Sequence, residues 1–270
     1  ADYELEYNVA CNMPEFDIIL YNYDEFVSSG ALKLYPDNLD GGLCIYRGWM
    51  LKPDKYEELY TKLKGIGINL INDVNEYTAC HLFPNSYKEI QDFTPKTKWY
   101  DDYKQINWNI INSQFNRFMI KDYVKSVKGT NFPSYFETPV DAEAMNKYID
   151  EFIQLRGSLF TNGIIIKEHV DFKKYEKTTN EYRAFYMYEK LVTVSRNSNQ
   201  PEYCPFVPIE FVNKFNGLKS NFYTVDFAEL DDGSWIIIET GDGQVSGLSP
   251  NQYVFKFYDE IRAIIQQIYV

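Results

Sequence analysis

The sequence predicts a fold of mixed class, α/β plus α+β, in which a small α/β domain over about residues 1–95 precedes an α+β domain over 96–270. In the first domain a strand, an amphipathic helix and a second strand follow one another, which is typical of a parallel α/β unit. In the second domain two pairs of alternating apolar runs enclose short turns, which indicates antiparallel hairpins. The aromatic content of 17% favours well-buried strands over disorder.

The elements of the α/β domain follow from apolar periodicity. "FDIILYN" (16–22) and "GLCIYRGWML" (42–51) are apolar runs typical of strands. Residues 53–65 have apolar side chains at helical spacing and end on glycine, so they predict a helix. "INLIN" (68–72) predicts a short strand. A Tyr-, Pro- and Lys-rich passage over about 83–102 lacks periodicity, and we place the domain boundary there.

The second domain contains alternating runs, amphipathic helices and turn residues. In chain order it is expected to contain a strand over 118–124, a helix over 142–155, a strand over 163–170, a hairpin over 181–196 that turns at Glu189-Lys190, a hairpin over 223–240 and a final helix over about 252–269.

Composition excludes several classes of protein. The net charge of −12 argues against a general nucleic-acid binder, which needs a basic field. No apolar run approaches the ~18 residues of a membrane span, and the acidic first ten residues do not resemble a signal peptide. The four cysteines are scattered without a Cys-x-x-Cys pair, so reduced thiols in a cytoplasmic protein are expected: Cys11, Cys44, Cys80 and Cys204.

The hairpin over 223–240 predicts a pair of opposed carboxylates. Asp232-Gly233 is typical of a two-residue type I′ turn, and counting back from it pairs Asp226 with Glu239. Directly opposite residues share a face with Cβ atoms roughly 4.5–5.5 Å apart, so the two carboxylates repel unless a cation lies between them. The sequence therefore predicts a cation site here. It also predicts that Asp226→Asn leaves the metal-free fold intact or more stable, because one repelling charge is removed.

Further polar residues recur where strands of the second domain end. Lysine and arginine neutralise phosphates, and Mg²⁺ binds carboxylate and phosphate oxygens, so such a set suits a polyphosphate with divalent cations. The set comprises Lys121, Lys167, Glu168, Arg183, Arg196, Asp226, Glu239 and Asp242.

These motifs, in their order and spacing, resemble the ATP-grasp superfamily, on the side of the RimK-like amide ligases. The resemblance covers nearly the whole chain. "FMIKDYVKS" resembles the strand with the first nucleotide lysine, and "GIIIKEHV" the strand with the second lysine that enters the adenine-binding hinge. "EYRAF" and "TVSR" resemble the paired arginine positions, "VDFAELDDGSWIIIETGDGQ" the metal-binding hairpin, and "YRGWML" with its following helix the smaller domain. The implied fold is a pre-ATP-grasp-like domain followed by a grasp of two subdomains, about 110–168 and 169–270.

The resemblance implies a nucleotide site for ATP. Lys121 and Lys167 would contact the phosphates and the adenine side of ATP, and Glu168, His169 and Val170 would form the hinge. The alternative for Lys121, with its neighbours at 125 and 128, is a solvated basic edge. The alternative for Lys167 is a strand end whose charged head reaches water.

Arg183 and Arg196 would hold the γ-phosphate and the negative charge that develops in the transition state. Arg183 could instead pair with Asp226 in a structural salt bridge. Arg47 is the candidate for binding a substrate carboxylate, because it follows a strand expected to face the cleft. The alternative is that Arg47 stacks on Trp49.

The resemblance also implies that Asp226 and Glu239 ligate Mg²⁺. The family has a third ligand, an Asn two residues after the Glu, and here that position is Gly241. Asp242 is adjacent and could take its place.

The implied reaction is ATP-dependent formation of an amide or peptide-type bond. A substrate carboxylate would become an acyl phosphate, with release of ADP, and an amine would then displace phosphate. The partners would be ATP, a carboxylate and an amine acceptor, which could be an amino acid, a peptide or a protein terminus. The alternatives are an ATP-grasp phosphotransferase and an inactive ATP-binding module.

Overall fold

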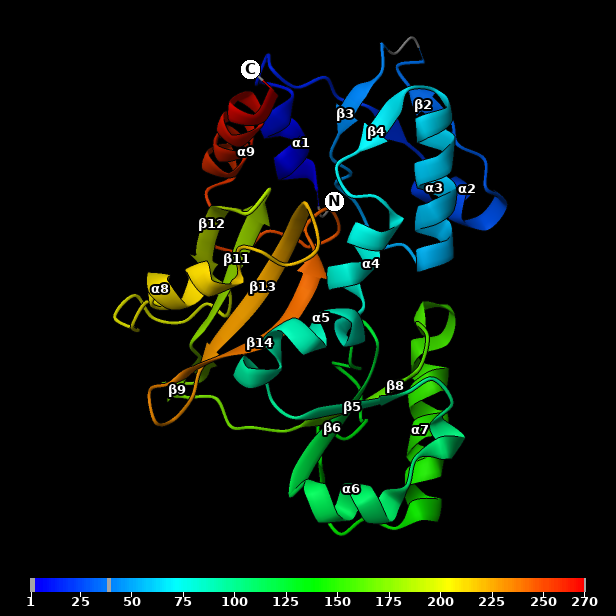
Figure 1. The fold of residues 1–270 in the computed structure, drawn as a ribbon, viewed down its shortest axis with the longest axis vertical. Coiled ribbons are helices and arrows are strands. Elements are labelled where there is room, and N and C mark those ends of the chain that lie inside the picture. The colour runs from blue at the N-terminus through cyan, green and yellow to red at the C-terminus, as the bar shows by residue number, and fades with distance from the viewer. Residues whose placement is uncertain (1–2, 38–39, 270) are drawn as a thin grey trace.

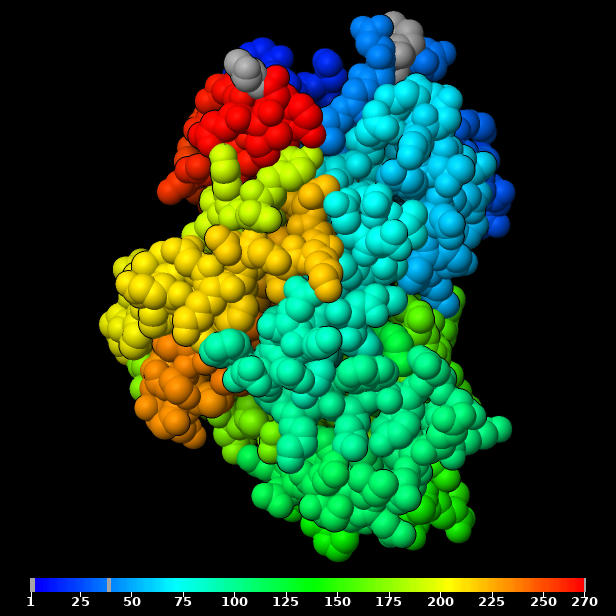
Figure 2. Space-filling model, viewed as in Figure 1, coloured from blue at the N-terminus to red at the C-terminus, as the bar shows by residue number. Residues whose placement is uncertain are grey.

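The computed structural model describes residues 3–37 and 40–269. It confirms the mixed α/β class: a large and a small four-stranded antiparallel sheet, each with helices, follow a small N-terminal α/β part (Figure 1). Figure 2 shows the N-terminal elements and the C-terminal helix together at one end of the molecule, and the small sheet with its helices at the other. Among the described helices, none has the length and apolarity needed to cross a membrane.

The N-terminal part contains the predicted parallel unit, because β3 and β4 pair in parallel across helix α3. The predicted strand over 16–22 is mostly wrong: only its last residues form β1, while Phe16 and Ile18 pack against the core near the C-terminal helix. The strand predicted over 42–51 ends at Cys44. The elements are α1 (Glu4–Ala10), β1 (Leu20–Tyr21), α2 (Tyr23–Ser29), β2 (Leu34–Tyr35), β3 (Gly42–Cys44), α3 (Pro53–Gly65) and β4 (Ile68–Leu70).

Two helices that the sequence did not predict connect this part to the small sheet. They are α4 (Val74–His81) and α5 (Phe83–Ile90), followed by the short helix η1 (Gln91–Phe93). Asp73 begins α4 with a capping box, and a proline stands in the first turn of α5. Both helices lie along strand β14, where Thr240 Oγ1 donates to the Cys80 carbonyl at 3.0 Å.

The small sheet has the strand order β5-β8-β6-β7, and its core packs against helix α7. The domain boundary that the sequence predicts near residue 95 falls between η1 and β5. The elements are β5 (Thr97–Tyr100), η2 (Tyr103–Gln105), α6 (Trp108–Gln114), β6 (Arg117–Asp122), β7 (Phe136–Glu137), α7 (Ala142–Arg156), η3 (Gly157–Leu159) and β8 (Ile164–Glu168).

The large sheet has the strand order β12-β11-β13-β14 and contains both predicted hairpins. The first turns at Tyr188-Glu189, one residue earlier than predicted, with both residues at positive φ. The elements are β9 (Lys174–Tyr175), β10 (Thr178–Thr179), β11 (Glu181–Met187), β12 (Lys190–Arg196), α8 (Ile209–Val212), η4 (Asn213–Phe215), β13 (Phe222–Glu229), β14 (Trp235–Asp242) and α9 (Val254–Tyr269).

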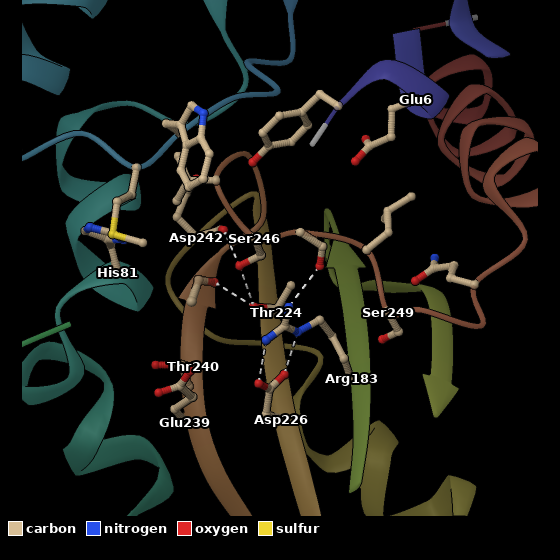
Figure 3. Close-up of a pocket in the computed structure, with 18 of the residues that line it drawn as sticks. Glu6, His81, Arg183, Thr224, Asp226, Glu239, Thr240, Asp242, Ser246 and Ser249 are labelled. Carbon is tan, nitrogen blue, oxygen red and sulfur yellow. Dashed lines mark hydrogen bonds and ion pairs between the residues drawn. The ribbon is translucent and has the colours of Figure 1, made fainter. Parts of the chain in front are cut away.

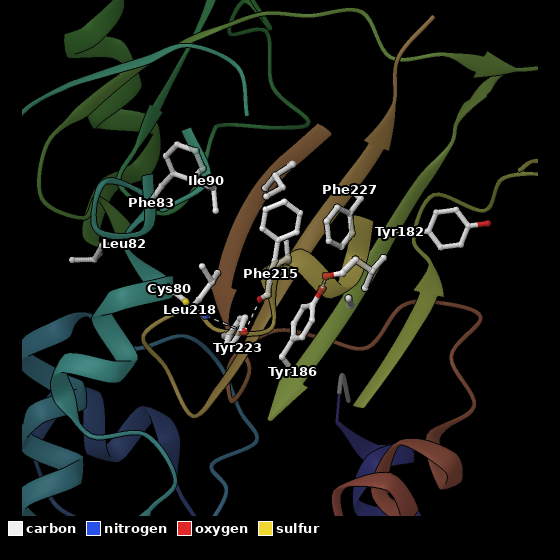
Figure 4. Close-up of a cluster of buried hydrophobic side chains, with 14 of the residues drawn as sticks. Cys80, Leu82, Phe83, Ile90, Tyr182, Tyr186, Phe215, Leu218, Tyr223 and Phe227 are labelled. Carbon is white, nitrogen blue, oxygen red and sulfur yellow. Dashed lines mark hydrogen bonds between the residues drawn. The ribbon is translucent and has the colours of Figure 1, made fainter. Parts of the chain in front are cut away.

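The two faces of the large sheet have different surroundings. One face is covered by an aromatic cluster in which Tyr186 stacks on Tyr223 at 5.0 Å, with Phe215 and Phe227 nearby (Figure 4). On the other face, α9 covers Phe185. Because side chains alternate along a strand, the residues between those of the aromatic cluster point to this second face, which carries the candidate site.

Candidate nucleotide and metal site

Asp226 and Glu239 are direct cross-strand partners, as predicted, but the register arises by a different route. The turn is a three-residue loop rather than the predicted two-residue loop, with Gly233 at φ 84° donating its N–H to the Leu230 carbonyl. This loop alone would place Asp226 opposite Ile238. A β-bulge beyond Phe227 inserts one residue and restores the predicted pairing.

The bulge is held by polar groups from outside the hairpin. Lys167 Nζ donates to the Ile238 carbonyl and lies 3.2 Å from Thr94 Oγ1, while the Thr94 hydroxyl donates to the Ile237 carbonyl at 2.9 Å. Burial lowers the pKa of Lys167 well below its ordinary value, and nearby Lys121 lowers it further. Lys167 therefore lies where two sheets meet, buried beneath the site rather than as a solvated strand end.

Each of the opposed carboxylates has its own cations. Arg183 holds Asp226 through two hydrogen bonds of 2.7 and 2.6 Å. Glu239 receives Lys121 at 3.2 Å and Lys125 at 3.3 Å. Burial alone would raise the pKa of Glu239, but the two lysines and Arg183 outweigh burial and hold that pKa well below its usual range. We call these five residues the charge cluster.

Lys125 reaches the charge cluster because of a tight turn after β6. The buried carboxylate of Asp122 accepts hydrogen bonds from the backbone N–H of Val124 at 2.8 Å and of Lys125 at 2.7 Å, and it is paired with Arg156. This turn brings Lys125 back toward Glu239. Sequence reasoning missed Lys125 as a site residue, although an Asp followed by a turn is a recognisable signal.

The charge cluster borders a cavity of about 480 Å³ (Figure 3). From Lys125 and Glu239 the cavity extends to Leu5 of α1 and Trp49. His81, at the end of α4, also borders it and was not predicted as a site residue. Burial lowers the pKa of His81 to about 3, and Lys125 adds to this effect, so the ring is neutral at physiological pH.

A family model described as an ATP-grasp domain, family 3 of its clade, matches residues 107–261, which is more than half of the chain. The chain belongs to this ATP-grasp family. No curated protein sequence matches it.

Solved structures of ATP-grasp ligases resemble the protein over most of its length. The D-alanine–D-alanine ligase from Bacillus anthracis complexed with ATP has 13% identity and a TM-score of 0.60, covering 97% of this chain and 90% of that chain. PsnB, complexed with a phosphomimetic variant of a minimal precursor, Mg and ADP, has 10% identity and a TM-score of 0.52, covering 97% and 94%. The D-cycloserine synthetase DcsG has 9% identity and a TM-score of 0.56, covering 86% and 87%. At these identities the likeness shows the ATP-grasp fold.

The predicted hinge of this ATP-grasp protein connects the small sheet to the large one. The backbone N–H of Glu168 donates to the Lys96 carbonyl at 2.8 Å, and that of His169 to the Arg117 carbonyl at 3.0 Å. The His169 ring lies 4.6 Å from the ring of Tyr135. Val170 follows as the chain leaves β8. Adenine recognition by these residues stays a prediction.

Arg196 does not join Arg183 at the site, which corrects the predicted pair of arginines. Arg196 lies opposite Tyr182, whose side chain belongs to the aromatic cluster, whereas Arg183 lies opposite Ser195. The two arginines therefore point to different faces of the sheet. Arg196 Nη2 donates to the Glu202 carbonyl at 2.7 Å, and its guanidinium lies 4.4 Å from the ring of Phe206.

Arg196→Ala is expected to lower the stability of the fold by about 1–2 kcal/mol, because it removes a bond to a loop carbonyl and a cation–π contact. ATP turnover at saturating substrate is expected to stay within about twofold of wild type, well below the tenfold change that 1.4 kcal/mol of barrier produces. Denaturant unfolding and an ADP-release assay check the two expectations. A tenfold or larger loss of turnover in a folded variant would return Arg196 to the site.

Asp242 does not provide a third metal ligand, which corrects a second expectation. Its carboxylate is buried away from the charge cluster, accepting from Asn72 Nδ2 at 2.5 Å and the Gln244 N–H at 2.9 Å. Burial raises the pKa of Asp242 to about 7. Cross-strand alternation explains the outcome, because Asp242 pairs with Tyr223 of the aromatic cluster.

Gly241 leaves no room for a side chain in the present arrangement. A Cβ at this position would lie 2.8 Å from Ser246 Oγ and 2.9 Å from Thr224 Oγ1. These two hydroxyls lie 3.0 Å apart and both border the cavity. Two hydroxyl groups therefore occupy the surroundings in which a longer side chain at 241 would lie.

Arg47 is committed to other protein groups, which corrects its assignment to a substrate carboxylate. Its Nε and Nη2 bind the two carboxylate oxygens of Glu6 at 2.8 and 2.9 Å, and Nη1 donates to the Gly243 carbonyl at 2.5 Å. Its guanidinium lies nearest the rings of Tyr3 and Phe257 rather than Trp49. Arg47 thus joins α1 to the loop after β14.

Proposed function

We propose that this protein is an ATP-dependent, ADP-forming ligase that joins a carboxylate to an amine. The charge cluster is the observation that carries the proposal. It brings cations from β6 and its following turn to carboxylates of β13 and β14, on the open face of the large sheet. The ATP-grasp family and fold support ATP as the substrate.

Asp226 and Glu239 have the chemistry of a magnesium site. They are adjacent on one face of the sheet, and each offers two carboxylate oxygens. Mg²⁺ usually takes one or two protein carboxylates and completes its shell with phosphate oxygens and water. Bound there, Mg²⁺ would neutralise phosphate oxygens. Within residues 3–37 and 40–269, no group of three His, Cys, Asp or Glu residues could hold a metal ion.

The cations of the charge cluster would change partners when ATP binds. Lys121, Lys125 and Arg183 now neutralise carboxylates, and phosphate oxygens would take over those hydrogen bonds. Arg183 is fixed by its hydrogen bond to the Gly247 carbonyl at 2.8 Å as well as by Asp226. A preorganised guanidinium of this kind stabilises charge that develops during phosphoryl transfer.

The reaction would proceed in two displacements. A substrate carboxylate oxygen attacks the γ-phosphorus, the bond from phosphorus to the ADP oxygen breaks, and an acyl phosphate forms. The amine then attacks the acyl carbon, phosphate leaves with the bonding electron pair, and the amine loses a proton. Phosphorylation converts a poor leaving group into a good one, so no nucleophilic side chain is required.

Product analysis tests this proposal. With a competent carboxylate, the products from ATP are expected to be ADP and phosphate, and hydroxylamine is expected to trap the acyl phosphate as a hydroxamate. Detection of AMP and pyrophosphate would indicate adenylation instead. ADP without hydroxamate across a panel of carboxylates would indicate a phosphotransferase, and ATP binding without turnover would indicate an inactive module.

Lys121→Met is expected to reduce the thermal stabilisation that ATP with Mg²⁺ confers, and Lys167→Met to reduce it as well. A ligand that binds only the folded state at 100 times its Kd stabilises it by about 2.7 kcal/mol. Loss of a phosphate-binding lysine should remove at least half of that gain. Thermal unfolding with and without ATP measures the difference and so corrects for any change in the ligand-free protein. Lys104→Met, at an exposed lysine of η2, is the control, and an equal loss there would mean that general charge is responsible.

A further inference from the structure

The cavity beside the charge cluster leads away from the small sheet. Its wall includes Val124 and Lys125 from the turn after β6, and its other lining residues come from the N-terminal part, from the end of α4, from the large sheet and from the loop after β14. If the proposed function is correct, ATP binds on the side of the lysines of β6 and β8. The cavity is then the space from which the amine approaches the acyl phosphate.

The charged side chains around this cavity are mostly acidic. Lys125 and Arg183 are its cationic lining residues among those that the structure describes, and both are bound to the carboxylates of the charge cluster. Glu6 borders the far side of the cavity, and Arg47 behind it is held by both Glu6 oxygens. No uncommitted cation among the described lining residues would receive a carboxylate on the acceptor.

The entrance region of the cavity is apolar. Leu5 is 64% exposed and Trp49 is 55% exposed, and both border the cavity together with Met50, Val245 and Leu248. These side chains come from α1, from the segment before α3 and from the loop after β14 (Figure 3). Convergence of apolar side chains from three segments on one cavity is typical of a binding site for an apolar group.

We propose that the acceptor is a primary amine that carries an apolar group and has no carboxylate next to the amine. An amino acid amide and the N-terminal residue of a peptide both have this chemistry. A free amino acid would place its carboxylate among Glu6, Asp226 and Glu239 without a counter-charge, and such like-charge contacts are strongly unfavourable. A protonated amine is attracted to the same acidic lining and becomes nucleophilic when it loses its proton. This inference rests on the proposed function and specifies its second substrate.

Calorimetric titration of the full chain with phenylalaninamide, phenylalanine and glycinamide, each in the presence of ADP and Mg²⁺, tests the inference. Phenylalaninamide is expected to bind at least tenfold more tightly than phenylalanine, which isolates the carboxylate, and at least tenfold more tightly than glycinamide, which isolates the apolar group. Equal or tighter binding of phenylalanine, or no binding of phenylalaninamide, would overturn the inference.

Trp49→Ala places the binding in this cavity. It is expected to weaken phenylalaninamide binding at least fivefold, whereas Trp99→Ala, at a tryptophan of β5 that is 41% exposed and does not line the cavity, should leave it unchanged. Equal effects of the two variants would also overturn the inference. Hydroxamate formation is measured separately. Hydroxamate formation with preferred binding of phenylalanine would reject the acceptor class alone, whereas amide binding without ADP release would reject the ligase.

Discussion

Glu239→Gln is expected to lower Mg²⁺-dependent ATP turnover by at least about 100-fold, the loss typical when a group that organises transition-state charge is removed. A neutral amide is a weaker ligand for a hard cation than a carboxylate. The variant also removes the partner of both Lys121 and Lys125, which lie 3.2 and 3.3 Å from the Glu239 carboxylate. The metal ligand and the orientation of two phosphate-binding cations are thus lost together.

The measurement is ADP release as a function of Mg²⁺ concentration, together with a thermal unfolding curve that shows the variant is folded. Glu143→Gln is the matched control, because Glu143 forms an exposed ion pair with Lys147 on α7. Exposed pairs of this kind contribute little, so the control should behave as wild type. Turnover of Glu239→Gln within threefold of wild type would remove Glu239 from the metal site.

Asp226→Asn is expected to destabilise the metal-free protein by about 3 kcal/mol, the lower end of the range for breaking a buried ion pair. The side chains of Arg183 and Asp226 are only 16% and 8% exposed, and the variant leaves the guanidinium without its counter-charge. The sign is opposite to the one that two repelling carboxylates predict. The difference arises because each carboxylate already has its own cation, so no unrelieved repulsion exists in the metal-free state.

Denaturant unfolding without ATP or Mg²⁺ measures this effect. The double variant Asp226→Leu with Arg183→Met provides the comparison, because replacing both partners by apolar groups leaves no buried unpaired charge. The double variant should therefore be more stable than Asp226→Asn alone. Unchanged or increased stability of Asp226→Asn would show that the ion pair is not formed in solution.

Local sequence patterns predicted much of the fold. The helix over 53–65 and the two hairpins of the large sheet were confirmed because periodicity and turn residues act over a few neighbouring positions. Predictions failed where the partner of a segment lies far away in sequence. The strand predicted over 42–51 stops at Cys44, because the N–H of Tyr46 is bound by the side chain of Gln244 instead of a neighbouring strand.

The family and the opposition of Asp226 and Glu239 follow from the order of the residues in the chain. How that opposition arises depends on contacts between the two sheets, because the bulge at Ile238 is held by Lys167, whose own strand lies in the other sheet. The same long-range packing determines which side chains share the site. A register difference of one residue reverses the face to which a strand side chain points, so Arg196 and Asp242 were lost from the predicted set. The counter-charges of the carboxylates come from Arg183 on a neighbouring strand and from lysines about a hundred residues earlier, and local patterns carry no information about contacts formed over such separations.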